Sequence, residues 1–187
     1  MEAAKLGKIR VTCAAHNLAS TRMLLTQDDV DLIRRTVARF PRAKPLVVVD
    51  LGAGSGTTAA AVFAERPDAQ VTTYDVYEVN VGWARLFIHN AFPLADWVGY
   101  VMDSVEAASM WQQKYADLVL IDTSHEYRHT AMELAEWHNR VKPSGYVWCH
   151  DYEGDYPGVR QAVNEAVLAG SFVMVEQRGL GCVLRKA

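Results

Sequence analysis

The chain has few cysteines, no long apolar run and no excess of positive charge, and each absence excludes a class of protein. Its three cysteines, Cys13, Cys149 and Cys182, lie far apart and form no CxxC pair or zinc-finger spacing. No apolar run has the length of a membrane span, and residues 1–8 lack the apolar core of a signal peptide. We therefore expect a cytoplasmic protein with reduced thiols and no membrane partner.

The charge balance does not indicate a nucleic-acid partner. The formal net charge is -3 and the pI is about 6.1, whereas nucleic-acid binders usually carry a basic face. The hydrophobic share of 50% and the charged share of 22% are typical of globular proteins. Because we find no repeat, low-complexity tract or linker, we expect a single domain over residues 1–187, with residues 1–26 as an N-terminal lid segment.

The most informative segment is VVVDLGAGSGT, from Val47 to Thr57. It predicts a buried strand that carries Asp50 near its end, breaks into a glycine loop and enters a helix. The loop has a glycine at every second position: Gly52, Gly54 and Gly56. Such a turn lets a ligand contact bare backbone. The next predicted strand, 71–75, ends in Asp75, and an acid there suits a ribose diol. The two segments together predict a cofactor that contains a nucleoside.

Apolar strands alternate with helical segments along the chain. Strands are predicted at 46–50, 71–75, 97–101, 117–122 and 146–149, with a closing hairpin from 172–175 and 182–184. Helices are predicted at 26–40, 57–65, 81–90, 106–113, 130–141 and 158–168, and a turn at 142–145. This order predicts an α/β fold: a Rossmann-like, doubly wound, mostly parallel seven-stranded sheet with a C-terminal antiparallel hairpin.

An aspartate stands at or just after the end of each of the first five predicted strands. These residues are Asp50, Asp75, Asp103, Asp122 and Asp151. Ligands of open parallel sheets bind beyond the carboxyl ends of the strands, so this edge is the expected site. The alternative for any one aspartate is that it only caps the following helix or turn.

The glycine loop with Asp50 and Asp75 resembles motifs I and II of class I S-adenosylmethionine-dependent methyltransferases. The resemblance runs from about Val47 to Leu184. It implies S-adenosylmethionine as cofactor, with glycine backbone at its amino-acid part, Asp75 at the ribose, and Asp103 and Ser104 at the adenine. The expected cofactor-binding residues are Asp50, Gly52, Gly54, Gly56, Asp75, Asp103, Ser104 and Asp122. The alternative, a nicotinamide-binding domain, is disfavoured because the third glycine comes one residue too early for GxGxxG.

Two later segments resemble a subgroup of these enzymes. IDTSHEY (121–127) and CHDY (149–152) are similar to the IDGxHxY and HDY segments of macrocin and mycinamicin sugar O-methyltransferases and related metal-dependent enzymes. The resemblance implies that Asp122 and Asp151 bind Mg²⁺, which holds vicinal hydroxyls and lowers the pKa of one. His125 is then the leading general base. His150 competes for that role or orients Asp151.

Four positions depart from the subgroup pattern. Tyr152, a poor Mg²⁺ ligand, stands where catechol-type sites have a third ligand. Thr123, Ser144 and Met102 replace glycines that are usual there. These departures do not change the expected fold, but they weaken the expectation that the protein binds a metal ion. Three tyrosines, Tyr127, Tyr152 and Tyr156, are candidates to line an acceptor pocket.

The function expected from this resemblance is transfer of a methyl group from S-adenosylmethionine to a hydroxyl oxygen of a small molecule, with sugars among the candidates. Methylation of nucleic acid or protein is disfavoured because the chain lacks an Asn-Pro-Pro-Tyr type motif and basic flanks. The alternative is a non-catalytic cofactor-binding module or partner subunit, since the chain has almost no substrate-capping insertion. A homodimer is a further expectation, because it would close the open acceptor side.

Overall fold

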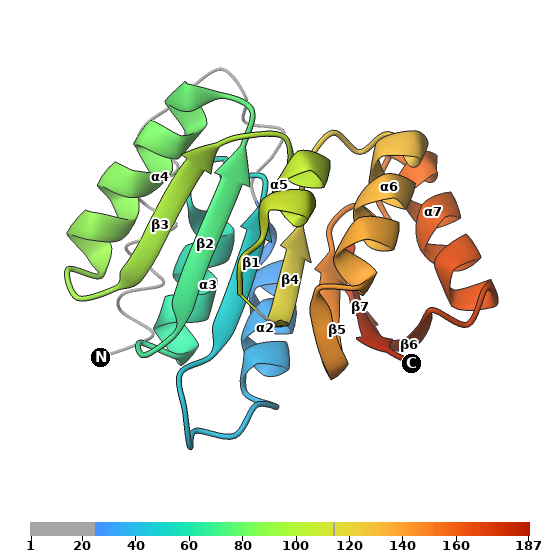
Figure 1. Ribbon diagram of the computed structural model, residues 1–187, viewed down its shortest axis with the longest axis horizontal. Helices are drawn as coiled ribbons and strands as arrows, with labels where there is room; N and C mark the ends of the chain where they lie inside the picture. The colour runs from blue at the N-terminus through green and yellow to red at the C-terminus, as the bar shows by residue number, and fades with distance from the viewer. Residues whose placement is uncertain (1–24, 114) are drawn as a thin grey trace.

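The computed structural model describes residues 25–113 and 115–187 and contains a central seven-stranded sheet between two layers of helices (Figure 1). Its strands are β1 (Val47–Leu51), β2 (Gln70–Asp75), β3 (Asp96–Val101), β4 (Ala116–Ile121), β5 (Val141–Cys149), β6 (Phe172–Arg178) and β7 (Gly181–Lys186). Its helices are α2 (Gln27–Val37), α3 (Thr57–Glu65), α4 (Glu78–Ala91), α5 (Ser104–Met110), α6 (Tyr127–His138) and α7 (Pro157–Leu168).

The strand order is β3-β2-β1-β4-β5-β7-β6. The first five strands pair in parallel, whereas β7 pairs antiparallel with both β5 and β6. The predicted Rossmann-like sheet with its closing hairpin is therefore confirmed. From β1 the next strands in the chain are added on one side as β2 and β3, and from β4 they are added on the other side, so the strand order switches between β1 and β4. Ligand sites of such sheets lie beside that switch.

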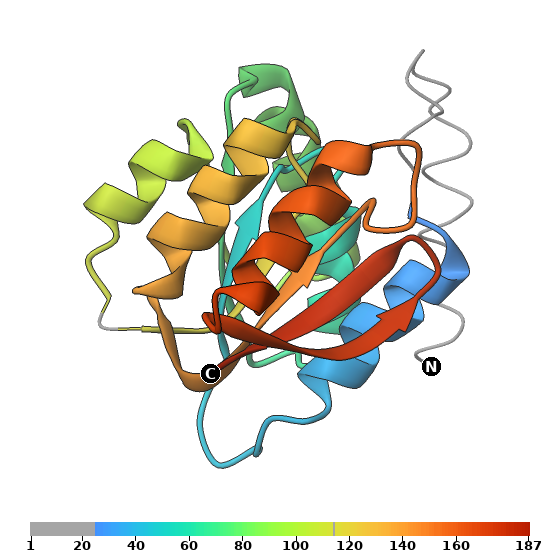
Figure 2. The same ribbon diagram turned by 90° about the vertical axis from the view of Figure 1, so that its right-hand side faces the viewer.

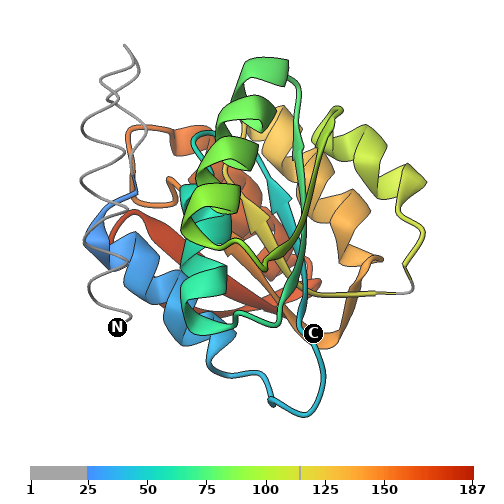
Figure 3. The same cartoon turned by 90° about the vertical axis from the view of Figure 1, so that its left-hand side faces the viewer.

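Both faces of the sheet are covered. Helices α2, α3 and α4 lie on one face, and α5, α6 and α7 lie on the other (Figures 2 and 3). Strand β4 is buried along its whole length, as expected for a central strand of a two-sided parallel sheet. Two large apolar cores result, one around Phe63 and Leu32 and the other around Trp137 and Leu134. The rigid sheet fixes the positions of the strand ends.

Helix α2 is joined to the closing hairpin by one buried carboxylate. Thr26 caps the helix, and Asp29 completes a capping box by accepting hydrogen bonds from the backbone and hydroxyl of Thr26. The other oxygen of Asp29 accepts from the amides of Leu180 and Gly181 in the β6–β7 turn, at 2.9 and 3.1 Å. The side chain of Asp29 therefore ties the start of the described chain to its end.

The turn predicted at 142–145 is wrong, because β5 runs through this segment. The pairing with β4 passes from Ala116–Val141 to Leu118–Tyr146, so the extra residues form a bulge within the strand. Ser144 adopts a φ of 61° inside this bulge. The Pro-Ser-Gly signal thus marks a local kink, while pairing on both sides keeps the strand continuous.

The other boundaries differ from the predictions by a few residues, mostly at helix starts. Helices α4, α5 and α6 begin earlier than predicted, at Glu78, Ser104 and Tyr127. The lid expected over 1–26 lies outside the described residues except for its last two. Among the helices that the structure describes, none has the length and apolar content needed to cross a membrane.

Candidate functional site

The glycine loop between β1 and α3 has left-handed backbone at all three predicted glycines. Their φ values are 93° for Gly52, 45° for Gly54 and 83° for Gly56. A Cβ on Gly52 would overlap the backbone carbonyl of Asp122, and one on Gly56 would press against Ala84. Only residues without a side chain fit these two positions, so the loop packs tightly on the β4 end and on α4.

Two features of the loop fit a ligand with a cationic group. Apart from Gly54 and its two chain neighbours, no described residue has an atom within 4 Å of the position of a Cβ on Gly54, so this face of the loop is open. Below it, the Asp50 side chain is fully buried and accepts a hydrogen bond from Thr73 through Oδ2, while Oδ1 has no hydrogen-bond partner among the described residues. A buried acceptor without a donor is costly, and an ammonium group would satisfy it. These residues fit the amino-acid end of the expected cofactor.

Asp75 at the end of β2 already supports the loop. Its Oδ2 accepts from the backbone amide of Ala53 at 2.9 Å and from the Asn80 amide at 3.1 Å, and its Oδ1 accepts from the Tyr77 amide at 2.8 Å. Since a carboxylate has about four acceptor positions, Oδ1 keeps room for one ribose hydroxyl. Asn80 was not predicted, because nothing in the sequence shows that α4 turns its amide toward Asp75.

The side chains of Asp103 and Ser104 make hydrogen bonds within the protein that the resemblance did not imply. Asp103 caps α5 by accepting from the amides of Val105 and Glu106. The Ser104 hydroxyl donates to Glu133 of α6 at 2.5 Å. Backbone rather than side chain would therefore have to meet an adenine ring at this segment.

Glu133 of α6 is hydrogen-bonded to two segments of the site, the start of α5 and the loop after β4. It is fully buried, and its Oε1 and Oε2 accept from Ser104 and from Thr123, the latter at 2.9 Å. His129 lies 3.3 Å from the same carboxylate. Sequence analysis missed Glu133, since a single acid in an amphipathic helix carries no signal of burial.

Replacing Glu133 with alanine is expected to lower the free energy of unfolding by about 2–4 kcal/mol. The change removes the carboxylate that accepts from the buried Ser104 hydroxyl and the half-buried Thr123 hydroxyl, and it creates a cavity. Urea denaturation measures the loss. The matched control is Glu136→Ala, an exposed acid on the same helix, which is expected to stay within about 0.5 kcal/mol of wild type. Equal stabilities of the two variants would contradict the structural role of Glu133.

The ends of β4 and β5 bring four predicted residues together: Asp122, His125, His150 and Asp151. Nε2 of His125 lies 3.1 Å from Asp122 Oδ1 and 3.0 Å from Asp151 Oδ2. Nδ1 of His150 lies 3.2 and 3.1 Å from the same two oxygens. The four donor atoms all lie within 4.8 Å of one another. Nitrogens and oxygens therefore alternate around one small ring, which we call the His-Asp cluster.

Charge in the His-Asp cluster is strongly coupled. Burial alone would lower the pKa of His150, but the carboxylates of Asp122 and Asp151 outweigh it and raise this pKa to about 12. Burial alone would raise the pKa of Asp122, but the two imidazoles outweigh it and lower this pKa to about 2. The other nitrogen of His150, Nε2, lies 3.5 Å from Asp29 Oδ2. His150 is thus a buried cation among three carboxylates and a poor general base.

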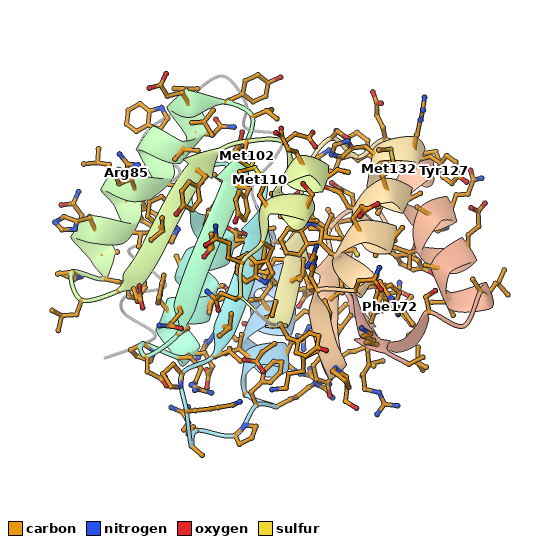
Figure 4. All side chains as sticks on the ribbon, viewed as in Figure 1. Arg85, Met102, Met110, Tyr127, Met132 and Phe172 are labelled. Carbon is orange, nitrogen blue, oxygen red and sulfur yellow. The ribbon has the colours of Figure 1, made fainter. Side chains whose placement is uncertain are left out.

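The backbone of the cluster is strained. His125 has a φ of 60° and Asp151 a φ of 56°, and only one other described non-glycine residue, Ser144, has a positive φ. Such conformations cost about 1–3 kcal/mol each and concentrate at functional sites. The ring of Tyr156 stacks on His125, with centroids 4.5 Å apart. Tyr127 and Tyr152 instead bond Glu165 and Asn164, and Tyr127 extends from the start of α6 (Figure 4).

The His-Asp cluster offers the expected Mg²⁺ a mixed set of ligand atoms. Two carboxylates converge as predicted, but two imidazole nitrogens share the same space. Mg²⁺ takes oxygen ligands almost exclusively. The donor set therefore does not fit magnesium well, although it suits other divalent cations.

A separate pocket lies between α4 and β3. Arg85, Phe92 and Trp97 are among its lining residues, and Arg85 extends from α4 at the far end of the molecule from Tyr127 (Figure 4). The pocket lies near the amino end of β3, away from the strand ends that carry the aspartates. It contains none of the predicted site residues.

Comparison with protein families matches residues 49–152 to a family described as a methyltransferase domain. The match begins in β1 and ends just after the His-Asp cluster, so it includes the glycine loop and all four cluster residues. It covers more than half of the chain. No curated protein sequence matches the chain.

Solved structures with the same fold extend over nearly the whole chain. An O-methyltransferase from Bacillus cereus in complex with SAH has a TM-score of 0.75 at 13% identity, over 98% of this chain and 90% of that one. A methyltransferase from Geobacter sulfurreducens has a TM-score of 0.73 at 15% identity, over 98% and 88%. A Clostridium thermocellum protein described as an rRNA methylase has a TM-score of 0.67 at 13% identity, over 88% and 100%. At these identities the likeness shows the fold alone.

Proposed function

The chain belongs to the methyltransferase-domain family, and from this premise we propose that it transfers a methyl group from S-adenosylmethionine to a hydroxyl oxygen of a small molecule. The observation that carries the proposal is the placement of two sites on one sheet edge. The open glycine loop follows β1, and the His-Asp cluster follows the neighbouring β4 and β5. One edge thus offers a nucleoside site beside groups that accept a proton.

The cofactor end of the site rests on backbone and on two carboxylates. When bound, S-adenosylmethionine supplies an activated methyl group on its sulfonium. The buried Asp50 accepts the ammonium of its amino-acid part through the unpartnered Oδ1. The Gly54 backbone would contact the same part of the ligand, and Oδ1 of Asp75 would accept a hydrogen bond from one ribose hydroxyl.

The acceptor end is the His-Asp cluster. In the metal-free site, Nδ1 of His125 accepts the proton of the acceptor hydroxyl while that oxygen forms its bond to the methyl carbon and the bond from this carbon to the cofactor sulfur breaks. Nε2–H of His125 donates a 3.1 Å hydrogen bond to Asp122, which holds the ring in place. Tyr156, stacked on His125, forms one wall for the acceptor. A divalent cation held by Asp122 and Asp151 would supply a Lewis acid for the hydroxyl, and magnesium in this role stays a prediction.

The proposal is tested in two stages with the full chain. Calorimetric titration with S-adenosylmethionine and with S-adenosylhomocysteine measures binding at the glycine loop. Formation of S-adenosylhomocysteine is then measured with a panel of sugars and catechols, with RNA as the competing acceptor class. Turnover with hydroxyl compounds supports the proposal, and turnover with RNA alone contradicts the small-molecule acceptor. Binding without turnover on any acceptor favours the non-catalytic module.

His125→Ala is expected to lower the methyl-transfer rate by about 10²–10⁴-fold and to leave S-adenosylmethionine affinity within about threefold of wild type. The reason is that His125 contacts the cluster and not the glycine loop. Rate and affinity are measured separately, by product formation and by calorimetry. The control His89→Gln removes an exposed histidine of α4 and is expected to change neither quantity. A rate loss matched by lost affinity would contradict the base role.

Because Asp50 is buried, we expect the stability of the cofactor-free protein to depend on pH. Burial raises the pKa of Asp50 from 3.8 to about 7, opposed by the 3.0 Å hydrogen bond from Thr73 and by the nearby Thr58 hydroxyl. A folded-state pKa above the unfolded value means that ionisation destabilises the fold. The contribution of Asp50 to the free energy of unfolding is therefore fully present below about pH 4 and is lost as the pH rises through 7.

The Asp50→Asn variant isolates this effect. Relative to the variant, wild type is expected to lose stability by on the order of 1 kcal/mol per pH unit between about pH 4 and 7, with no further change above that range. Urea denaturation at a series of pH values measures the difference. The same variant should bind S-adenosylmethionine more weakly, because a neutral amide cannot pair with its ammonium. A pH-independent difference in stability would contradict the buried, titrating Asp50.

A further inference from the structure

The four close contacts of the His-Asp cluster exceed what hydrogen bonds can supply. Two nitrogens, His125 Nε2 and His150 Nδ1, each lie within 3.0–3.2 Å of the same two oxygens, Asp122 Oδ1 and Asp151 Oδ2. Each nitrogen carries at most one hydrogen. Two hydrogens cannot be well directed at four contacts, so each proton would be shared between two acceptors.

One cation at the centre of the ring accounts for all four contacts at once. Ligand atoms about 2.0–2.1 Å from a tetrahedral zinc ion lie about 3.3–3.4 Å apart. The four nitrogen–oxygen distances of 3.0–3.2 Å are close to four of the six edges of such a tetrahedron, and the nitrogen–nitrogen and oxygen–oxygen distances are at most 4.8 Å. Metal binding would displace the proton of His150, and each neutral imidazole would then present a lone pair toward the centre.

The donor types select the kind of ion. Imidazole nitrogens suit zinc, copper, iron and nickel, whereas magnesium and calcium take oxygen. Two nitrogens and two carboxylate oxygens form a typical set for a borderline divalent transition metal. We propose that Asp122, His125, His150 and Asp151 together bind one such ion, with Zn²⁺ as the reference case, in preference to Mg²⁺.

Asp29 lies behind the proposed site, where it faces a metal ligand and not the metal itself. Its Oδ2 lies 3.5 Å from Nε2 of His150, on the side of the ring opposite the cluster, and both side chains are buried. Metal-binding histidines usually place their other nitrogen against such a carboxylate, which fixes the tautomer and the ring orientation. Here the capping box of α2 and the β6–β7 turn hold Asp29 in place. Nε2 of His150 makes no hydrogen bond to the described residues, and Asp29 is the carboxylate placed to orient it once metal is bound.

The proposed metal site rests on the proposed function in one respect only: both place the methyl acceptor at the His-Asp cluster. The base role needs a hydrogen on Nε2 of His125, whereas the ligand role needs the lone pair of that nitrogen, so the two roles belong to the metal-free and the metal-loaded protein, respectively. Metal binding can be measured without any acceptor, and S-adenosylmethionine binding can be measured without metal. The two proposals therefore succeed or fail separately.

The test uses the full chain after treatment with EDTA and buffer exchange. Zn²⁺, Co²⁺ and Mg²⁺ are titrated by calorimetry, and the Co²⁺ complex is recorded by visible absorption, which is intense for tetrahedral nitrogen–oxygen sites. We expect one Zn²⁺ or Co²⁺ per chain and Mg²⁺ affinity at least about 100-fold weaker. Mg²⁺ binding as tight as Zn²⁺ binding, or no Zn²⁺ binding at tens of micromolar, would overturn the proposal.

Variants test the ligand set. His125→Ala is expected to weaken Zn²⁺ affinity by about 100-fold or more and to change the Co²⁺ spectrum. Asp29→Asn is expected to weaken it by about 10–100-fold. The control is Asp28→Asn. Asp28 is the exposed neighbour of Asp29 and pairs with Arg178, so its replacement should leave the Zn²⁺ affinity unchanged. Circular dichroism checks that each variant is folded. Unchanged Zn²⁺ affinity in folded His125→Ala would overturn the four-ligand site.

Discussion

Gly52→Ala is expected to abolish S-adenosylmethionine binding and to lower the free energy of unfolding by about 3 kcal/mol or more. The alanine Cβ would overlap the backbone carbonyl of Asp122, and the φ of 93° is itself unfavourable for a residue with a side chain. Backbone cannot move aside as a flexible side chain can. Either the glycine loop or the β4 end must shift, and both belong to the site.

Two other glycines give matched controls for Gly52→Ala in the same chain. Gly82→Ala lies in α4, where no described atom is within 4 Å of the new Cβ, and should stabilise the fold by up to about 1 kcal/mol. Gly54→Ala also meets no described atom within that distance, so the fold should survive with a cost of about 1–2 kcal/mol for its φ of 45°.

The Gly54 variant should nevertheless bind S-adenosylmethionine at least about tenfold more weakly, since its Cβ enters the open face of the loop. Urea denaturation and calorimetry separate stability from binding in all three variants. A Gly52 variant as stable as wild type would show that the loop does not press on Asp122. Wild-type affinity in the Gly54 variant would contradict contact between cofactor and loop.

His150→Ala is expected to destabilise the metal-free protein by about 3–5 kcal/mol. The change leaves Asp29, Asp122 and Asp151 buried or half-buried around one space without the cation that now lies among them. Removing one partner of a buried charge group costs far more than the intact group contributes, because the remaining charges stay desolvated. The carboxylates would then repel one another across the site.

Denaturation in the presence of EDTA measures this effect in the metal-free state. His89→Gln, which removes an exposed histidine from α4, provides the control and should change stability by less than about 0.5 kcal/mol. The double variant His150→Ala with Asp122→Asn should recover part of the loss, because one of the stranded charges is gone. A single variant with wild-type stability would mean that the three carboxylates tolerate the loss of His150.

The sheet could be predicted from the sequence because its signals are local. Apart from one aspartate in each, the runs Val47–Leu51 and Ala116–Ile121 are apolar because a two-sided parallel sheet buries both faces. The aspartates follow the strands because strand ends open onto solvent or ligand. The bulge at 142–145 was mistaken for a turn, since Pro, Ser and Gly signal a bend and cannot show whether the strand resumes its pairing.

The candidate site could be predicted only in part. Asp122, His125, His150 and Asp151 were found because they stand in short segments near two strand ends. Asp29 and Glu133 were missed, since each acts on residues far away in the chain: Asp29 on the β6–β7 turn and His150, Glu133 on Ser104. No spacing along the sequence encodes such contacts.

By itself, the sequence determined the order of strands and helices, the glycine loop and the row of aspartates at one edge. Each depends on periodicity or on backbone freedom within a few residues. Only the tertiary structure decided how these aspartates are used: Asp75 holds the loop, Asp103 caps a helix, and Asp122 and Asp151 meet two imidazoles. The physical reason is that charge, burial and hydrogen bonding depend on distances in space, and these distances exist only once the strands have paired and the helices have packed.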